Sequence, residues 1–437
     1  MLKKIIFVII ISITITCCKS LRTKQQQLTK KDLNGYWEQQ GEGEIIEIND
    51  SLVISYHSSN FNCYPNWKIT REYFNTKTPT ITLNDDESFT NKEGFTLHTY
   101  LKLKEKPKLC TELTEIQKNN NTYNFETLWN TFNEQYVYFK ERNIDWNVIK
   151  SKYQSKFNDK TESFEFYLLL EKMVLELKDS HSDFEVPDEF EEQWHKLNKK
   201  NDTSDYKTLA QNKILNKYLK NVKTYNDGQI YYGLINYGIG YVQLNSMEEI
   251  DNMPTIADSI ISEIKNTKVC VIDLRFNNGG DDVMALDFLS HFIDKPYNVY
   301  TKRRRFKEGF TDNQTIKIEP AKNRYTKEIY VLTSSYTVSA AETAILATLN
   351  FPNFKKIGSN TNGAFSDILN KTLPNGWNYW LSNEVYEGMN GKNYEVSGIP
   401  PDYKIDYPRE KEQFLKSLYF ELDKEDRAIE KAMELIK

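Results

Sequence analysis

The chain has 437 residues and a mass of 51.5 kDa, with 39% hydrophobic and 27% charged residues. Such a composition can bury a large core and divide into roughly two or three domains. A formal net charge of -5 gives no electrostatic reason to expect a nucleic-acid partner. We expect the one dense basic run, residues 302–305, to be a solvated strand edge.

The first residues, MLKKIIFVIIISITITCCKS, contain a Lys pair, an apolar run from Ile5 to Ile15, and then Cys17 and Cys18. The run is too short to span a bilayer but suits a secretory signal. It resembles a bacterial lipoprotein signal, which implies cleavage before a Cys that then carries lipid. We favour Cys18 over Cys17 as that residue, so that residues 1–18 are the signal and 19–32 a tether. The expected location is the bacterial cell envelope, with a lipid anchor in the membrane.

From residue 33 to 117, apolar and polar residues alternate, as in EIIEINDSLVISYH. Period-two alternation broken by Asn, Asp and Gly predicts an antiparallel β module. Cys63 and Cys110 could form a disulfide in an oxidising compartment, although the sequence does not fix their distance. We expect Cys270, inside an apolar run, to be a buried free thiol.

The period changes to that of helices between residues 118 and 186, where Phe125, Leu128 and Phe132 share one face. This helical segment ends in the motif LELKDSHSDF. The next stretch, 187–228, is charged and rich in Asn and Lys, with weak helical character, and we interpret it as a connector or mobile insert.

Strands and helices alternate from residue 229 to 437. The predicted strands are IGYVQLNS, KVCVIDLRF, KEIYVLTS and FKKIGS, and the predicted helices are DSIISEIKN, DVMALDFLSHFI and AAETAILATL. This order predicts a largely parallel sheet covered by helices. The fold class is therefore α/β (α+β) and multidomain, with an α/β core, a helical segment and an N-terminal antiparallel β module.

Two loops after buried strands are candidate sites, because open α/β sheets place ligands beyond the carboxyl ends of their strands. In RFNNGGDD, the N–H groups of Gly279 and Gly280 could stabilise an oxyanion, or the pair could simply form a turn. In SSYTVSAAE, Ser339 heads a helix and could be a nucleophile. Ser339 and Glu342 also have the spacing of a capping box, which needs no function.

A serine nucleophile needs a base, and the chain has five histidines. His57 and His98 lie in the β module, His195 in the charged connector, and His291 on an apolar helix where a core histidine is expected. His181 remains, in a polar loop. The sequence has no Cys-x-x-Cys or His-x-x-x-His pair, so we expect no zinc site. A serine nucleophile with a histidine base needs no metal and no cofactor, and we expect neither.

Seven motifs in order between residues 125 and 407 resemble one family of serine peptidases. They are FNEQYVYFKERNIDWNVIKSKY, LELKDSHSDF, IGYVQLNSM, VIDLRFNNGG, YVLTSSYTVSAAE, IGSNTNG and YEVSGIPPDYKI. The family includes C-terminal-processing (tail-specific) proteases, the tricorn protease core and retinoid-binding relatives. The resemblance implies a crotonase-like ββα catalytic core and a peptidase that acts on polypeptides.

The resemblance has two catalytic branches. In the tail-specific branch a lysine is the base, but its position falls on Ala364, and Lys355 and Lys356 precede the loop. In the tricorn-like branch the base is a histidine preceded by a serine, with a distant glutamate. This chain matches that second branch with Ser180, His181 and Glu395.

The implied relay runs from Ser339 to His181, Ser180 and Glu395. The implied oxyanion donors are the N–H of Ala340 and that of Gly279, in preference to Gly280.

Tail-specific proteases hold their substrates with a PDZ domain, and residues 187–228 are too few to form one. Substrate capture is therefore expected from a sheet edge, the connector or the β module. The alternative to a peptidase is a ligand-binding lipoprotein of the same fold without catalysis.

Overall fold

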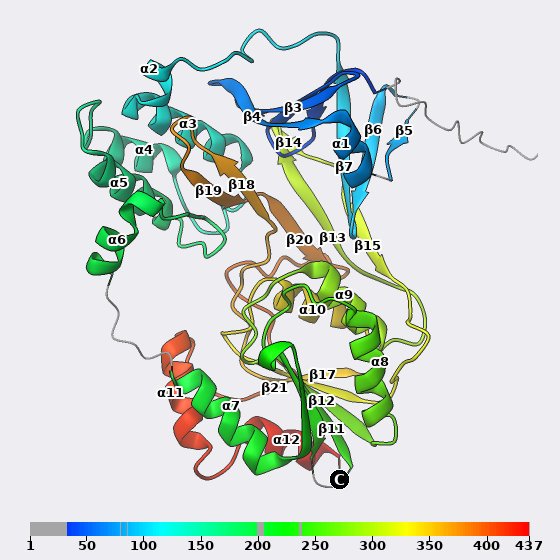
Figure 1. Ribbon diagram of the computed structural model, residues 1–437. Helices are drawn as coiled ribbons and strands as arrows, with labels where there is room; N and C mark the ends of the chain where they lie inside the picture. The colour runs from blue at the N-terminus through cyan, green and yellow to red at the C-terminus, as the bar shows by residue number, and fades with distance from the viewer. Residues whose placement is uncertain (1–32, 79, 85, 199–204, 236–237, 437) are drawn as a thin grey trace, which may run out of the picture.

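The computed structural model describes residues 33–78, 80–84, 86–198, 205–235 and 238–436. The signal, Cys17, Cys18 and the whole tether lie outside these residues. Within the described ranges, no helix has the length and apolar character needed to cross a membrane. Figure 1 shows the β module at the top, the helical segment beside it and the α/β core below.

The N-terminal β module is one antiparallel sheet. Its elements are β1 (Gly35–Gln39), β2 (Glu44–Ile48), β3 (Leu52–Ser58), β4 (Cys63–Thr70), α1 (Arg71–Lys77), β5 (Thr82–Leu83), β6 (Ser88–Glu93) and β7 (Thr96–Leu103). The strand order is β4-β3-β2-β1-β7-β6-β5. Alternation buries one face, where the rings of Trp37 and Phe89 pack edge to face with centroids 4.8 Å apart. The predicted antiparallel module is confirmed.

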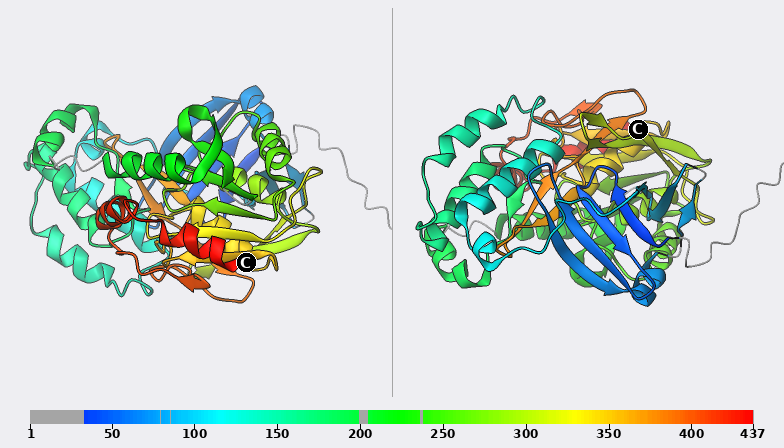
Figure 2. Two further views of the ribbon diagram at one scale, coloured as in Figure 1. Left: turned by 90° about the horizontal axis from the view of Figure 1, so that it is seen from below. Right: turned by 90° about the horizontal axis from the view of Figure 1, so that it is seen from above.

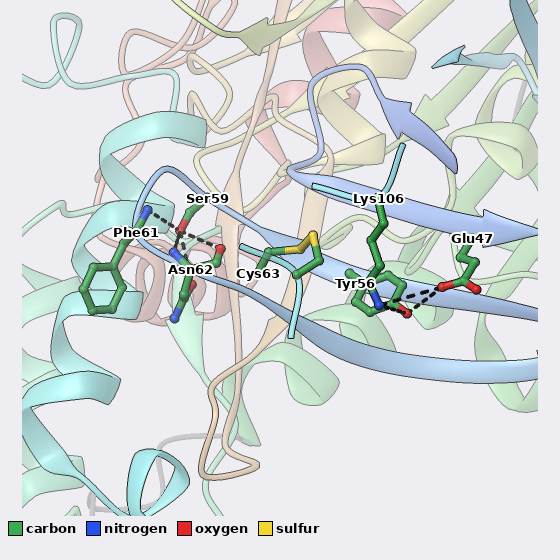
Figure 3. The surroundings of a disulfide bond; sticks show 8 residues. Glu47, Tyr56, Ser59, Phe61, Asn62, Cys63 and Lys106 are labelled. Carbon is green, nitrogen blue, oxygen red and sulfur yellow. Dashed lines mark hydrogen bonds and ion pairs between the residues drawn. A yellow bond between two sulfur atoms is a disulfide. The ribbon is translucent and has the colours of Figure 1, made fainter. Parts of the chain in front are cut away.

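A disulfide joins Cys63, at the start of β4, to Cys110 (Figure 3). It ties the segment after β7 back to the sheet across 47 residues of sequence. Nearby, Lys106 donates a hydrogen bond of 2.8 Å to the Tyr56 hydroxyl, which donates one of 2.8 Å to Glu47. Cys270 is a buried free thiol, as expected.

The helical segment packs its apolar stripes together. Its helices are α2 (Glu115–Lys118), α3 (Asn121–Gln135), α4 (Trp146–Gln154), α5 (Ser163–Leu175) and, beyond the short strand β8 (Asp183–Phe184) and a 3-10 turn (Asp188–Phe190), α6 (Glu191–Leu197). Phe125, Leu128 and Phe132 of α3 share one core with Tyr167 and Leu170 of α5. The two views of Figure 2 show this segment to one side of the β module and the core.

The α/β core is built on a second seven-stranded sheet. Its elements are α7 (Asp205–Tyr218), β9 (Leu219–Tyr225), β10 (Ile230–Ile235), β11 (Ile239–Leu244), α8 (Met253–Ile264), β12 (Val269–Asp273), α9 (Asp282–Ser290), β16 (Ile329–Thr333), α10 (Ala340–Thr348), β17 (Phe354–Gly358), β21 (Tyr403–Lys404), α11 (Lys411–Glu421) and α12 (Arg427–Leu435). The order is β21-β17-β16-β12-β11-β10-β9, with β11 to β21 parallel and β9 and β10 antiparallel.

Helices cover both faces of this sheet because the strands are apolar on both sides. In β12, Cys270 and Ile272 pack in the cluster that holds α8, α9 and α10. The alternate residues Val269 and Val271 pack with α7, α11 and α12. The predicted, largely parallel sheet with covering helices is confirmed.

The interpretation of residues 187–228 as a connector is wrong for its second half. Helix α7 packs on the core through Ala210, Ile214 and Leu215, and β9 pairs with β10. A 3-10 turn (Asn226–Gly228) joins those two strands. The apolar residues of α7 are few, but they fall on one face of the helix, so a charged composition hid a core element.

Two smaller antiparallel sheets complete the structure. One contains β13 (Tyr297–Phe306), β14 (Gly309–Phe310), β15 (Gln314–Ile318) and β20 (Glu384–Gly388), and the other β8, β18 (Ile368–Thr372) and β19 (Asn378–Ser382).

The basic run 302–305 is not the solvated edge that we expected. Lys302 and Arg304 are only 4% and 6% exposed. Lys302 Nζ lies 2.9 Å from Glu384 Oε2, and Arg304 lies 2.8 Å from Glu384 Oε1 and 3.1 Å from Glu42 Oε1. Strand alternation turns every second cation of β13 inward, where carboxylates pair with it.

Candidate active site

Ser339 stands at the junction between β16 and α10 in an unusual backbone conformation. Its φ is 59° and its ψ is -128°, and its side chain makes no capping hydrogen bond. A non-glycine residue with positive φ costs about 1–3 kcal/mol, and such strain is concentrated at functional sites. The capping-box interpretation is wrong for the serine hydroxyl, which is left free for chemistry.

Glu342 does more than a capping box requires: besides interacting with the Ser339 backbone N–H, it binds a second loop. Its carboxylate accepts hydrogen bonds from the N–H groups of Gly363, at 2.7 Å, and Ala364, at 2.8 Å. The Ala364 carbonyl in turn accepts the Ser339 N–H at 3.2 Å. The loop of residues 361–365 is thereby held directly behind Ser339.

Gly279 lies against Ser339. A Cβ atom at Gly279 would be 2.5 Å from Ser339 Cβ and 3.1 Å from Ser339 Oγ, and its φ is +100°. Both the space and the backbone conformation therefore require glycine. The loop after β12 and the loop after β16 meet here, as the parallel sheet predicts.

The two glycines differ in what their N–H groups do. The Gly279 N–H donates to Asn277 Oδ1 at 2.9 Å, so it is engaged. Gly280 forms a parallel β-bridge with Met247. The hydrogen bonds of this bridge come from the residues on either side of Gly280: the Met247 N–H donates to the Gly279 carbonyl, and the Asp281 N–H donates to the Met247 carbonyl. The Gly280 N–H lies outside that bridge, and Gly280 and Ala340 both line the cleft beside Ser339. The Gly279 N–H, which the resemblance favoured as an oxyanion donor, is thus bonded to Asn277 in this structure.

His181 is buried in the loop between α5 and β8, with 5% of its surface exposed. The backbone N–H of His181, not its ring, donates to Asp179 Oδ1 at 3.0 Å. Burial lowers the pKa of His181, and the charges of Arg142 and Lys411 lower it further, whereas Asp179 opposes them. The imidazole is therefore held neutral, the form that a general base needs. Its Nδ1 has no hydrogen-bond partner within the described part of the chain.

Glu395 is buried beside the same loop. Its carboxylate accepts the Phe365 N–H at 3.0 Å and a hydrogen bond from the Arg142 guanidinium, which also lies 3.5 Å from Asp179. Burial, with the charge of Asp179, raises the pKa of Glu395 to about 8 against the opposing charge of Arg142. Phe365 follows Ala364, so Ser339 and Glu395 bind consecutive residues of one loop.

Ser180 does not join His181 to Glu395 in this arrangement. It is exposed, and among the described residues no hydrogen bond connects it to either. The buried serine is Ser182, whose hydroxyl donates to Asp179 at 3.3 Å and accepts the Ser382 N–H at 3.3 Å. The predicted relay through Ser180 is therefore not formed here.

Sequence reasoning missed two residues of this cluster. Asp179 stands within the motif DSHSDF and, like Asp183, lies two residues from His181, so it could have been noticed as a candidate carboxylate. Arg142 gave no signal, because its partners are 37 and 253 residues away along the chain.

The other histidines lie as expected. His57 and His98 belong to the β module, where His57 accepts the Thr372 N–H and His98 pairs with Glu42 at 2.9 Å. His195 is exposed on α6. His291 is a core histidine whose Nδ1 lies 2.8 Å from the Asn323 carbonyl.

The residues that the sequence offered for a lysine base, Ala364, Lys355 and Lys356, do not supply a base of the tail-specific kind. Ala364 occupies the loop position behind Ser339, is 1% exposed and carries no ionisable group. Lys355 is exposed on β17, and Lys356 pairs with Asp402 at 2.9 Å. Among the described residues, no group of three or more His, Cys, Asp or Glu side chains could hold a metal ion.

A cleft of about 530 Å³ opens beside Ser339. One wall comes from the core, with Gly280 and Ala340, and another from β18, with Ile368 and Asn370. The third wall comes from residues 93–96 of the β module. The cleft is thus shared by parts of the chain that are far apart in sequence.

Comparisons with known proteins agree with this architecture. Residues 238–405 match peptidase family S41, and residues 117–174 match the tricorn protease C1 domain. A candidate peptidase from Parabacteroides merdae is 22% identical, with a TM-score of 0.59 over 72% of this chain and 96% of that one. Mature CPAF is 12% identical, with a TM-score of 0.53 over 71% and 97%.

The photosystem II D1 C-terminal processing protease is 15% identical over 70% of this chain and 98% of that one, with a TM-score of 0.44. The two higher TM-scores show the fold. The chain carries a match to peptidase family S41 over residues 238–405, and ahead of it a match to the tricorn protease C1 domain over residues 117–174.

Proposed function

We propose that this protein is a serine peptidase in which Ser339 is the nucleophile and His181 the general base. One observation carries the proposal: Ser339 heads α10 with a strained backbone and a hydroxyl that caps nothing, beside Gly279 and an open cleft. Strained backbone conformations of this kind are concentrated at active sites, where they hold a side chain in the orientation that the chemistry needs.

In the proposed reaction, Ser339 Oγ attacks a peptide carbonyl carbon while His181 takes the hydroxyl proton. The oxyanion that forms accepts hydrogen bonds from the N–H groups of Ala340 and Gly280. The intermediate collapses to an acyl-serine, and His181 returns the proton to the leaving amine. Water, activated by the same imidazole, then releases the acyl group and restores Ser339.

The charged cluster behind His181 supports this role. Asp179 holds the backbone of the histidine loop, and Arg142 links Asp179 to Glu395, which binds the loop behind Ser339. We assign Asp179 and Glu395 as positioning residues rather than as proton carriers. His181 Nδ1 is buried without a hydrogen-bond partner among the described residues, so a water or a small rearrangement would have to complete the orientation of the ring.

We further propose that the enzyme works on polypeptide segments at the bacterial cell envelope, held by an N-terminal lipid anchor. The sequence of residues 1–18 motivates the anchor, and the disulfide between Cys63 and Cys110 supports an oxidising compartment. Metabolic labelling with an alkyne fatty acid should mark the wild type, and Cys18→Ala should abolish the mark. If Cys17→Ala abolishes the label and Cys18→Ala does not, Cys17 is the lipidated residue.

Substitution tests the catalytic assignment. Ser339→Ala and His181→Ala should each lower the rate of casein or peptide hydrolysis by at least about 1,000-fold with the fold retained. Ser180→Ala is the matched control, because an exposed hydroxyl outside the cluster should change the rate by less than about 3-fold. A large loss of the hydrolysis rate in Ser180→Ala would support the relay through Ser180 that the resemblance implied. Full activity of Ser339→Ala would refute the proposal.

The alternative is a ligand-binding lipoprotein of the same fold without catalysis. The feature that favours it is the missing partner of His181 Nδ1, since a triad histidine is normally oriented at that atom. Wild-type protein that binds peptides but never cleaves them would support this alternative.

A further inference from the structure

Strand β18 is an edge strand whose neighbour lies on one side only. It pairs antiparallel with β19, from Ile368 opposite Ser382 to Thr372 opposite Asn378, in a sheet of order β18-β19-β8. Across the described residues, no strand pairs with its other edge. Backbone groups on an open edge can accept a further strand.

The register shows which groups face that open edge. Leu373 N donates to Trp377 O at 2.9 Å, so alternation turns Leu369 and Lys371 toward β19 as well. Ile368, Asn370 and Thr372 therefore direct their N–H and C=O groups away from β19.

Two of these outward-facing residues already have partners from elsewhere. The Thr372 N–H donates to His57 Nε2 at 3.1 Å, and the Thr372 carbonyl accepts the Tyr64 hydroxyl at 2.7 Å. The Ile368 N–H donates to the Asp367 carboxylate at 2.9 Å. Within the described chain, the N–H and C=O of Asn370 and the C=O of Ile368 remain without a partner.

These free groups lie in a groove that leads to Ser339. The cleft beside Ser339 and a second hollow of about 710 Å³ share Glu42, Leu369 and Asn370 as lining residues. The second hollow is also lined by Trp67 of the β module and Trp380 of β19. The open edge of β18 is therefore the border between the nucleophile's cleft and an aromatic hollow.

We propose that an extended stretch of the polypeptide substrate pairs with β18 at Asn370 and becomes the fourth strand of its sheet. The inference rests on the proposed function, since the groove matters to catalysis only if Ser339 is the nucleophile. The β module limits the length of the open edge, because its His57 and Tyr64 already bond the N–H and C=O of Thr372. Only Ile368 to Asn370 is then available, about 10 Å of strand, so the paired stretch of substrate is short.

Binding, rather than hydrolysis, tests the edge directly. The receptor is the full-length Ser339→Ala protein, and the probe is an unstructured, fluorescein-labelled casein peptide of about fifteen residues, about 50 Å when extended. Asn370→Pro removes the free N–H, and an edge strand tolerates proline where that N–H faces outward. The loss of one N–H···O bond should raise the Kd about 3- to 10-fold.

Asn370→Ala is the matched control, because it removes the side chain and keeps the backbone N–H. Its Kd should equal that of the parent. An unchanged Kd in Asn370→Pro, or an equal rise in Asn370→Ala, would overturn the proposal.

Amide hydrogen exchange on the unsubstituted edge gives a second measurement that does not depend on how a proline variant folds. The Asn370 amide should exchange quickly in free Ser339→Ala protein and slowly when the casein peptide is bound. An amide that stays fast in the complex contradicts the pairing. A second contradicting result would be a wild-type protein that is a dimer and becomes a monomer on Asn370→Pro. The edge of β18 would then pair with a second copy of this chain and not with substrate.

Failure of the edge and failure of the catalytic proposal are separable. If the peptide pairs at Asn370 but the protein never cleaves it, the proposal for β18 holds and the assignment of Ser339 as nucleophile is wrong. Cleavage that depends on Ser339, with no effect at Asn370, would mean the reverse.

Discussion

At the scale of single residues, the account depends on a contact that only glycine allows. Gly279 brings the loop after β12 so close to Ser339 that any β-carbon would overlap the serine side chain. The double-glycine motif showed that something approaches this backbone closely, but not what. The approaching group is the nucleophile itself, which belongs to the next strand of the sheet.

Gly279→Ala should therefore damage the site beyond the general cost of alanine at positive φ. The matched control is Gly376→Ala, because Gly376 has a φ of +92° but no atom within 4 Å of a β-carbon. We expect both variants to lose stability, and Gly279→Ala alone to lose hydrolysis by about 100-fold or more through displacement of Ser339. Equal rates of peptide hydrolysis in the two folded variants would contradict this assignment.

At the scale of elements, helix α10 and the loop of residues 361–365 act as one unit. Glu342, in the first turn of α10, binds two amides of that loop, and the loop binds the N–H of Ser339. The sequence correctly predicted the helix and its acidic first turn. It could not predict that Glu342 reaches across to another loop, because a capping box has the same spacing.

The titration of Glu342 gives this unit a measurable pH dependence. Burial raises the pKa of Glu342 from 4.5 to about 7, against hydrogen bonds from Thr361 and the loop amides that lower it. The folded state therefore holds the proton more tightly than the unfolded chain between these values. The resulting stability is complete below pH 4.5 and is lost as the pH rises through about 7.

Glu342→Gln removes this titration and keeps the size of the side chain. The free energy of unfolding in urea should fall more for the wild type than for the variant between pH 4.5 and 7. Parallel curves over this interval would show that Glu342 is not titrating in the folded protein.

At the scale of the whole molecule, the site is assembled from segments that the sequence keeps apart. Periodicity predicted β11, α8, β12, α9, β16, α10 and β17, because each buries a regular apolar face. It missed α7 and β9, where few apolar residues stand among many charges. It also placed the cations of β13 in solvent, since their partners Glu384 and Glu42 come from other parts of the chain.

Some residues of the candidate site could be predicted from the sequence and others could not. Ser339, His181 and Glu395 could be selected from ordered motifs. The structure joins Ser339 and Glu395 to the consecutive residues 364 and 365, whereas His181 is connected to Glu395 through Asp179 and Arg142. The roles of Asp179 and Arg142 depend on contacts across up to 253 residues, which no local pattern encodes. The β module, whose role was not legible, supplies one wall of the cleft and the cap of the β18 edge.

The most direct test of the central claim is covalent labelling by a fluorophosphonate, with the adduct mapped by mass spectrometry. If Ser339 is activated by His181, the wild type should carry one adduct on Ser339. The labelling rate should drop by about 1,000-fold or more in His181→Ala. An adduct on another serine, or labelling of Ser339 that is equally fast without His181, would contradict the account.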